Sequence, residues 1–152
     1  MDRRTLGWLL VVVQFALLIV LVLLPRRPMA LMPAILGLLL ILAGVVLGLK
    51  ASQRLGGALT PTPVPIGGAG LRTTGVYEHV RHPIYSAVLL AVLGYCLAIG
   101  STWSWAWAAV ILVFFWTKSR WEDRLLHEEY GAAWLAWARR TGALVPRLGR
   151  RP

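Results

Sequence analysis

The chain has 152 residues, of which 58% are hydrophobic and 14% charged, and its formal net charge is +10. This composition is too apolar for an ordinary soluble domain, and it predicts one integral membrane domain over residues 1–152. The positive charges flank apolar runs instead of covering a polar surface, so we expect them to contact anionic lipid headgroups and not nucleic acid.

The first two predicted membrane spans, Leu6–Leu24 and Met29–Leu49, together form an amino-terminal unit of residues 1–49. At about 1.5 Å per residue, each run is long enough to cross a hydrocarbon core of roughly 30 Å. Basic residues before the first run also fit a signal peptide, but residues 23–26 lack the small residues of a cleavage site. We therefore expect a retained first span.

The next predicted region is a cytosolic loop over residues 50–82. It contains the Pro-rich stretch Thr60–Pro65, followed by a Gly-rich stretch at residues 67–70. A stiff extended segment joined to a flexible one is typical of a connector. A phosphate-binding loop would need the spacing Gly-x-Gly-x-x-Gly after a strand, and this sequence offers neither.

Two shorter apolar runs, Ile84–Ile99 and Trp103–Trp116, are separated only by Gly100, Ser101 and Thr102. This spacing predicts a tight antiparallel hairpin over residues 83–117. The expected fold is therefore all-α, a polytopic membrane protein with about four transmembrane helices. A cytosolic amphipathic helix and tail would follow over residues 118–152.

The orientation of the spans follows from the positions of Lys and Arg. Fourteen of the sixteen flank one end of the predicted spans, and only Arg26 and Arg27 lie at the other. The positive-inside rule then places both termini and the 50–82 loop in the cytosol, as for a plasma or inner membrane protein.

A first polar cluster, residues 77–85, reads Tyr-Glu-His-Val-Arg-His-Pro-Ile-Tyr and precedes the third span. Pro83 suits the first turn of a helix and keeps His82 out of a helical conformation. Arg81 and His82 should then lie in a turn, with Tyr85 on the first helical turn. A cation, an imidazole and phenols would then converge at this turn, as in a binding site. The alternative interpretation is that these residues only anchor the span at the membrane interface, because Arg and Tyr commonly flank spans.

Metal binding is disfavoured by the same cluster. His79 and His82 have no obvious third ligand nearby, and Arg81 would repel a cation. The one cysteine, Cys96, lies in an apolar run without a partner. We therefore expect no metal.

A second polar cluster lies on a helix predicted over Ser119–Arg140. Successive residues turn by about 100°, which gathers four polar side chains on an arc expected to face solvent and form ordinary i,i+4 pairs. These are Asp123, Arg124, His127 and Glu128. The opposite arc is apolar, yet Glu122 and Glu129 lie in its middle. Burying a carboxylate alone costs several kcal/mol, so each must be paired, bound to a ligand or at a wet edge.

Glu122 is the carboxylate expected at the same membrane face as the first cluster, because it follows the fourth span closely. A salt bridge from Glu122 to Arg81 or Arg72 would satisfy its charge without any catalytic function. A bound cationic group would satisfy it equally well.

In this order, around one helical hairpin, the two clusters resemble the isoprenylcysteine carboxyl methyltransferase and phospholipid methyltransferase group of membrane enzymes. The resemblance covers roughly Leu71–Pro146. In that group, Gly-x-Tyr leads into Arg-His-Pro-x-Tyr, and a hairpin, a Glu-Glu pair, an aromatic-rich helix and an aliphatic-Pro closure follow. The matching residues are Gly75, Tyr77, Arg81, His82, Pro83, Tyr85, Glu122, Leu144, Val145 and Pro146. The departures are Asp123 for the second Glu, Ser86 and Ala87 for a common Gly, and Trp134 and Trp137 for frequent tyrosines.

The resemblance implies S-adenosylmethionine as methyl donor and a lipophilic acceptor at the cytosolic membrane face. The residue types suit this donor, because Arg81 could grip its carboxylate bidentately and Glu122 could accept its ammonium. We expect these two residues to be catalytic. The expected donor-binding residues are Tyr77, Arg81, His82, Pro83, Tyr85 and Glu122. The donor would arrive from the cytosol and the acceptor laterally between helices, and no metal is required.

Two other function classes compete with a methyltransferase. A membrane reductase of the steroid-reductase type has a similar carboxyl-terminal hairpin but should need a longer chain. A non-catalytic anchor would explain the spans but not Glu122 and Glu129. The acceptor stays open among an isoprenyl-thioether carboxylate, a phospholipid amine, a small thiol and other lipophilic molecules, and the oligomeric state stays open too.

Overall fold

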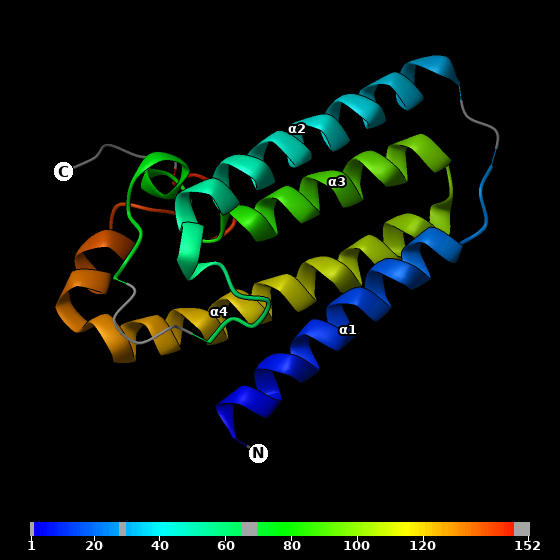
Figure 1. Ribbon diagram of the computed structural model, residues 1–152. Helices are drawn as coiled ribbons and strands as arrows, with labels where there is room; N and C mark the ends of the chain where they lie inside the picture. The colour runs from blue at the N-terminus through cyan, green and yellow to red at the C-terminus, as the bar shows by residue number, and fades with distance from the viewer. Residues whose placement is uncertain (1, 28–29, 65–69, 148–152) are drawn as a thin grey trace.

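The computed structural model describes residues 2–27, 30–64 and 70–147, and every regular element in these ranges is a helix. Two short 3-10 turns, η1 (Gly56–Ala58) and η2 (Gly75–Glu78), accompany four long helices (Figure 1). The long helices are α1 (Arg3–Leu23), α2 (Leu31–Leu55), α3 (Pro83–Ile99) and α4 (Thr102–Ala138). The predicted all-α class is thus confirmed for the described part of the chain. Met29, Pro65, residues 67–69 and the end of the basic tail, residues 148–152, lie outside it.

Helices α1 and α2 are both long and apolar enough to cross a membrane. An N-cap begins α1, where the carboxylate of Asp2 accepts a 2.6 Å hydrogen bond from the Thr5 amide. Large apolar side chains on both helices stay exposed, as expected for surfaces that face lipid. Helix α2 continues to Leu55, beyond the predicted end of the second span at Leu49.

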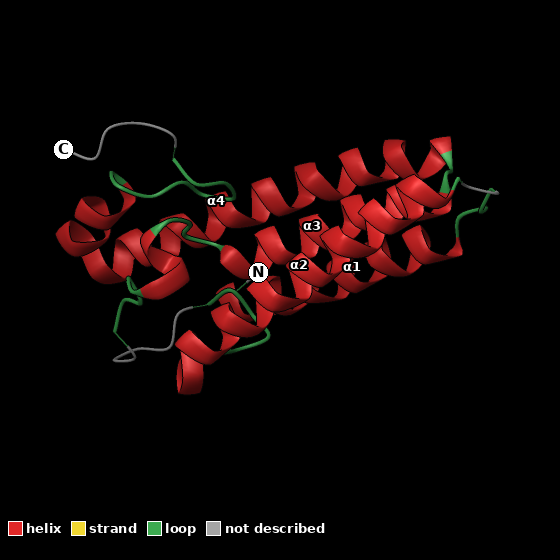
Figure 2. Ribbon diagram, turned by 90° about the horizontal axis from the view of Figure 1, so that it is seen from above, coloured by secondary structure: helices red, strands yellow, loops and turns green. Residues whose placement is uncertain are grey.

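Helices α2 and α3 pack along a seam of small residues and lie side by side in Figures 1 and 2. A Cβ atom added at Gly37 would collide with the carbonyl oxygen of Gly94, and one added at Gly94 would collide with that of Gly37. At Gly44 the added atom would lie 2.6 Å from the Ala87 carbonyl oxygen. The two backbones therefore touch, which only glycine permits here.

The predicted hairpin is present between α3 and α4. Helix α3 begins at Pro83 and ends before Gly100, whose left-handed conformation (φ 62°) reverses the chain. Ser101 then precedes α4. The buried core between α1, α3 and α4 consists of Leu21, Val92, Cys96, Ala108, Ile111 and Phe115.

The predicted break between Trp116 and Ser119 is wrong, because α4 runs without interruption through these residues, and the single helix predicted over Ser119–Arg140 is itself interrupted at Gly131. Neither Gly nor Pro lies between Trp116 and Ser119, so nothing there ends the helix. The irregular residue is instead Gly131, with φ 52° and ψ −121°. After Gly131, α4 turns toward the start of α3 (Figure 1).

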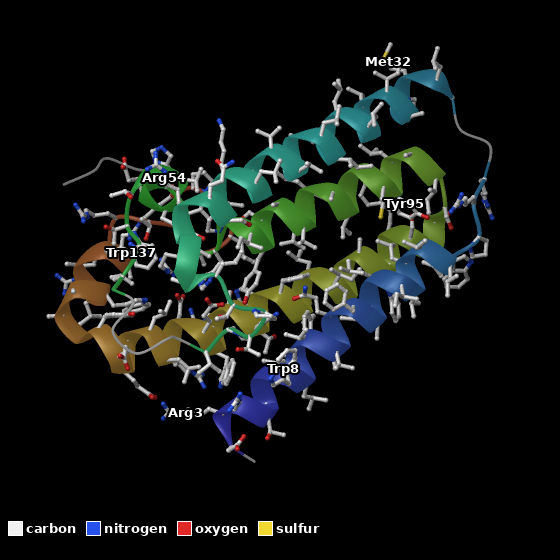
Figure 3. The ribbon with its side chains drawn as sticks, in the orientation of Figure 1. Arg3, Trp8, Met32, Arg54, Tyr95 and Trp137 are labelled. Carbon is white, nitrogen blue, oxygen red and sulfur yellow. The ribbon has the colours of Figure 1, made fainter. Side chains whose placement is uncertain are left out.

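Helix α1 lies against α4, anchored by the indole of Trp107, which donates a 2.8 Å hydrogen bond to the Leu17 carbonyl. At one end of the helices, the amide of Arg27 donates to Ile99. Figure 3 shows Arg3 and Arg54 at the opposite end, away from Met32 and Tyr95. Arg3 and Arg54 thus lie at the end of the helices opposite Arg27.

Candidate active site

The Arg-His-Pro motif lies where the carboxyl-terminal segment returns to the start of α3. The backbone amide of Arg81 donates to Gly142 (2.8 Å), and that of His82 donates to Ala143 (3.1 Å). The hydroxyl of Ser86, one turn into α3, donates to the carbonyl of Leu144 at 2.6 Å. The predicted closing segment therefore begins directly against the motif.

The guanidinium of Arg81 is held on two sides. Its Nε and Nη2 donate to the two carboxylate oxygens of Asp123, at 3.1 and 2.9 Å. Its Nη1 donates to the carbonyls of Thr141 (2.7 Å) and Ala138 (3.3 Å). The Arg81 and Asp123 side chains are only 12% and 8% exposed. This ion pair ties the start of α3 to α4 and to the segment that follows it, and such bidentate pairs are the strong ones.

The imidazole of His82 lies between two carboxylates. Its Nε2 is 3.0 Å from Asp123 Oδ1, and its Nδ1 is 3.6 Å from Glu122 Oε2. Burial alone would lower the pKa of His82, but the Glu122 and Asp123 charges outweigh it and raise the pKa to about 9. The imidazolium and Arg81 in turn keep the pKa of Asp123 below its usual value despite burial. His82 is therefore charged at neutral pH.

Glu122 is the more open of the two carboxylates, with a side chain that is 23% exposed. Its Oε2 accepts a 2.6 Å hydrogen bond from the hydroxyl of Tyr85. The Tyr85 ring also stacks on the imidazole of His82, with centroids 5.4 Å apart and planes 8° from parallel. Glu122 can therefore accept a further donor, which Asp123 cannot easily do.

The other predicted donor-binding residues, Tyr77 and Pro83, are both buried. Trp137, near the end of α4, donates a 2.8 Å hydrogen bond from its indole to the Tyr77 carbonyl. Burial, and then the charge of Glu122, raise the pKa of the Tyr77 hydroxyl, which therefore stays neutral. The structure thus brings all six residues predicted to bind the donor to one place.

A cavity of about 330 Å³ opens beside these residues. Tyr77, Arg81, Tyr85 and Glu122 all line it, and so does Phe15 of α1. The 58–64 segment forms another wall, so part of the predicted connector also shapes the site. A volume of this size and mixed lining is typical of small-ligand sites.

The comparisons with known proteins place the chain in a family. Residues 32–133 match the phospholipid methyltransferase family, which is more than half of the chain. The chain belongs to the phospholipid methyltransferase family. This confirms the resemblance drawn from the two polar clusters. No curated protein matches the chain.

The structure corrects one interpretation of the sequence, which placed Asp123 on a solvated face paired with His127. In this family member Asp123 is 6% exposed and bonded to Arg81 and His82. The solvated arc follows only from the polarity of the residues on this one helix. That polarity contains no information about the start of α3 and the carboxyl-terminal segment, which cover the other side of α4. The signal in the sequence that could have identified Asp123 as a site residue is its place as the second acid of the Glu-Glu pair in the family motif.

Two further expectations about the acidic residues are corrected. Arg81 pairs with Asp123 and not with Glu122, so the salt bridge considered for Glu122 does not form with Arg81. Glu129 is exposed and not on a buried face, because α4 extends beyond the other helices there. Among the described residues that line the cavity, Glu122 is therefore the only carboxylate.

Sequence reasoning also missed Lys118, which was counted only as a charge at the end of a span. This side chain is 3% exposed and lines the cavity. Its spacing of i,i+4 from Glu122 was the available signal, because such residues share one helix face.

Within residues 2–27, 30–64 and 70–147, no cluster of three or more His, Cys, Asp or Glu could hold a metal.

Proposed function

We propose that the protein transfers a methyl group from S-adenosylmethionine to a lipophilic acceptor at the cytosolic membrane face. The observation that carries this proposal is Glu122, a partly exposed carboxylate at a cavity where the neighbouring Arg81 and His82 are already paired with Asp123. An ammonium group would complete its hydrogen bonding. The family supports methyl transfer to a lipid-related acceptor.

The residues at the cavity fit the chemistry of this donor. Glu122 would accept the donor's ammonium as a charge-assisted hydrogen bond. Four of the five N–H donors of Arg81 already form hydrogen bonds to Asp123, Thr141 and Ala138. We therefore assign Arg81 one hydrogen bond to the donor's carboxylate instead of the bidentate grip predicted from the sequence.

The remaining predicted site residues would shape the donor site. His82 holds both carboxylates in place through its two ring nitrogens. The rings of Tyr77 and Tyr85 line the cavity, and aromatic faces suit an adenine or a sulfonium cation. Pro83 fixes where α3 begins and so where Tyr85 lies.

The residues of this chain would contribute to the reaction by positioning the reactants and by excluding water from the cavity. When bound, S-adenosylmethionine supplies an electrophilic methyl group, which a lone pair of the acceptor displaces from sulfur. The walls of the cavity would hold the two reactants in line and exclude water. Neither Arg81 nor Glu122 needs to move a proton, so their proposed role is to bind and orient.

For the membrane arrangement, we propose four crossings with both termini in the cytosol. Helices α1 and α2 meet the length and apolarity needed, while α3 and the first part of α4 form the hairpin between them. Phe15 lines the cavity and is 56% exposed on the lipid-facing side of α1. A lipid-dissolved acceptor would therefore reach the cavity laterally past Phe15.

Calorimetry on the purified protein in a neutral detergent tests the proposal. S-Adenosylhomocysteine should bind, and a reduced nicotinamide dinucleotide should not. Binding of the dinucleotide alone would indicate a reductase, and binding of neither would indicate an anchor. Mass spectrometry of host lipids incubated with isotope-labelled donor would then identify the acceptor.

A further inference from the structure

Lys118 is a buried cation that the proposed donor site does not use. Its ammonium donates a 2.6 Å hydrogen bond to the side-chain carbonyl of Gln14 on α1. Among the described residues, no carboxylate lies within 4.0 Å of it. Burying a lysine is costly unless its charge is compensated, so a buried lysine at this position is unusual.

Aromatic rings surround the ammonium of Lys118 on its other sides. It lies 5.0 Å from the ring centroid of Tyr85, 5.9 Å from that of Phe115 and 6.0 Å from that of Phe114. The faces of such rings attract a cation. An ammonium has three donors, and Gln14 takes one of them. The site is therefore a charged donor group that lacks an anion.

Lys118 and Gln14 both line the cavity that Glu122 lines. Tyr85 separates the two charged ends, because its hydroxyl donates to Glu122 while its ring faces Lys118. The cavity thus has a carboxylate beside one part of Tyr85 and an ammonium beside another. Phe15, which is exposed toward lipid, lines the same cavity.

We propose that Lys118, oriented by Gln14, binds an anionic oxygen group of the lipophilic acceptor, either a carboxylate or a phosphate. This inference rests on the proposed methyl transfer and narrows its acceptor to molecules that carry both an apolar chain and an anion. The apolar chain would leave the cavity past Phe15, so the anion is the part that enters. Of the other charged residues at the cavity, Arg81 and Glu122 are left to the donor, His82 lies between Glu122 and Asp123, and Arg72 is exposed.

The test measures how strongly the full-length protein, in a neutral detergent, prefers an anionic lipid analogue. The probes are hexadecyl phosphate, hexadecanoate and the neutral hexadecanol, which share one chain and differ in the head. Binding is followed by thermophoresis with S-adenosylhomocysteine present. At least one anionic probe should bind about tenfold or more tightly than hexadecanol, as expected for a hydrogen bond to a charged group. The tighter of the two identifies a phosphate or a carboxylate acceptor.

Three variants assign the preference to Lys118. Lys118→Gln keeps a polar partner for Gln14 but removes the charge, and it should abolish the preference. Lys118→Arg should retain it. Arg120→Gln is the matched control, because it removes one charge from the exposed face of the same helix and should leave the preference intact.

A fourth variant keeps the proposal testable if Lys118→Gln does not fold. Glutamate is close in size to glutamine, so Gln14→Glu places a carboxylate beside the ammonium and should retain the contact between α1 and α4. The new carboxylate would form an ion pair with Lys118 and occupy the place of the ligand's anion, so the preference for anionic probes should be lost.

Four outcomes decide the inference, and a fifth decides the proposed methyl transfer. Loss of the preference in Lys118→Gln or Gln14→Glu, with Arg120→Gln unchanged, supports it. A preference that survives both substitutions overturns it, and so does a wild-type protein that binds all three probes equally. A lower affinity for S-adenosylhomocysteine in Lys118→Gln, with the lipid preference intact, would assign Lys118 to the donor's carboxylate instead. Failure of wild-type protein to bind S-adenosylhomocysteine would overturn the proposed methyl transfer and is read separately from the lipid preference.

Discussion

Helices α2 and α3 meet along an apolar seam where Gly37 and Gly94 bring the backbones into contact. The start of α3 meets α4 and the carboxyl-terminal segment instead through Arg81, His82 and Asp123. The seam depends on the absence of side chains, and it carries no charge. The junction depends on ionised groups that are nearly inaccessible to water. Substitutions that add side-chain volume should therefore destabilise the seam, and substitutions that remove a charge should destabilise the junction.

This difference separates two tasks within one small membrane protein. Close packing joins the helices without using any group that could bind a ligand. The charged junction fixes the turn before α3, and it also forms part of the cavity wall. Arg81 and His82 balance Asp123 and Glu122 in charge, so the junction itself is close to neutral. Lys118 lies outside this balance.

The largest expected effect comes from removing the centre of the junction. Asp123→Ala leaves Arg81 buried without its ion-pair partner, which typically costs about 3–5 kcal/mol. We expect a correspondingly large fall in the thermal unfolding temperature in detergent, with the helix content of the folded state unchanged. Glu128→Ala is the matched control on the same helix. Its pair with Arg3 is 55–66% exposed and should contribute at most about 1 kcal/mol. Equal effects of the two substitutions would contradict this comparison.

A somewhat smaller effect is expected at the seam. Gly94→Val adds atoms where the carbonyl oxygen of Gly37 lies, so the helices must move apart. Overpacking of this kind costs about 1–3 kcal/mol, and the upper end is expected because backbone cannot yield like a side chain. Thermal unfolding checks this. In the control Gly48→Ala, the new methyl would meet the Ala87 side chain at an ordinary 3.5 Å and should change little. A neutral Gly94→Val would show that the backbones do not touch.

The helices themselves were largely predictable from the sequence. Long apolar runs fix α1 and α2, and Pro83 and Gly100 mark the ends of α3 by their backbone preferences. The continuity of α4 was missed because the predicted end of the fourth span followed hydropathy. Hydropathy reports where lipid ends and not where a helix ends.

The junction was predictable only in part. Local sequence placed Arg81 and His82 in a turn, and the motif order placed Glu122 near them. The position of Asp123 depends on the carboxyl-terminal segment folding back onto the start of α3. Arg81 contacts Asp123, which is 42 positions away in the chain, and Thr141, which is 60 positions away. A helical arc contains no information about such a contact. The burial of Lys118 likewise depends on where α1 lies.

A smaller effect, confined to ligand binding, is expected at Glu122. Glu122→Gln keeps a carbonyl oxygen for the Tyr85 hydroxyl but removes the charge that would hold the donor's ammonium. The dissociation constant for S-adenosylhomocysteine should rise about tenfold, or roughly 1.4 kcal/mol, with little change in thermal stability. Glu129→Gln, on an exposed position of the same helix, should bind like wild type. Unchanged affinity in Glu122→Gln would remove the main support for the donor site.

The smallest effect near neutral pH is the titration of the junction itself. His82 faces Glu122 and Asp123 of α4, with Arg81 beside it and the Tyr85 ring stacked on it. The two carboxylates raise the pKa of His82 from 6.5 in the unfolded chain to about 9 in the folded protein. A raised pKa means that the folded protein binds the proton more tightly. The stability contributed by His82 is therefore complete below about pH 6.5 and is lost as the pH rises through 9.

Thermal unfolding between pH 6 and 10 tests this sign. The unfolding temperature of the wild type should fall steadily above about pH 6.5, and that of Gly94→Val should fall in parallel from a lower start, because the seam has no titrating group. His82→Gln should flatten the profile in this range. If the Gly94→Val profile were flat instead, the pH dependence would belong to the packing of α2 on α3. A steep profile that survives in His82→Gln would assign the titration to another group and separate His82 from the charge of the junction.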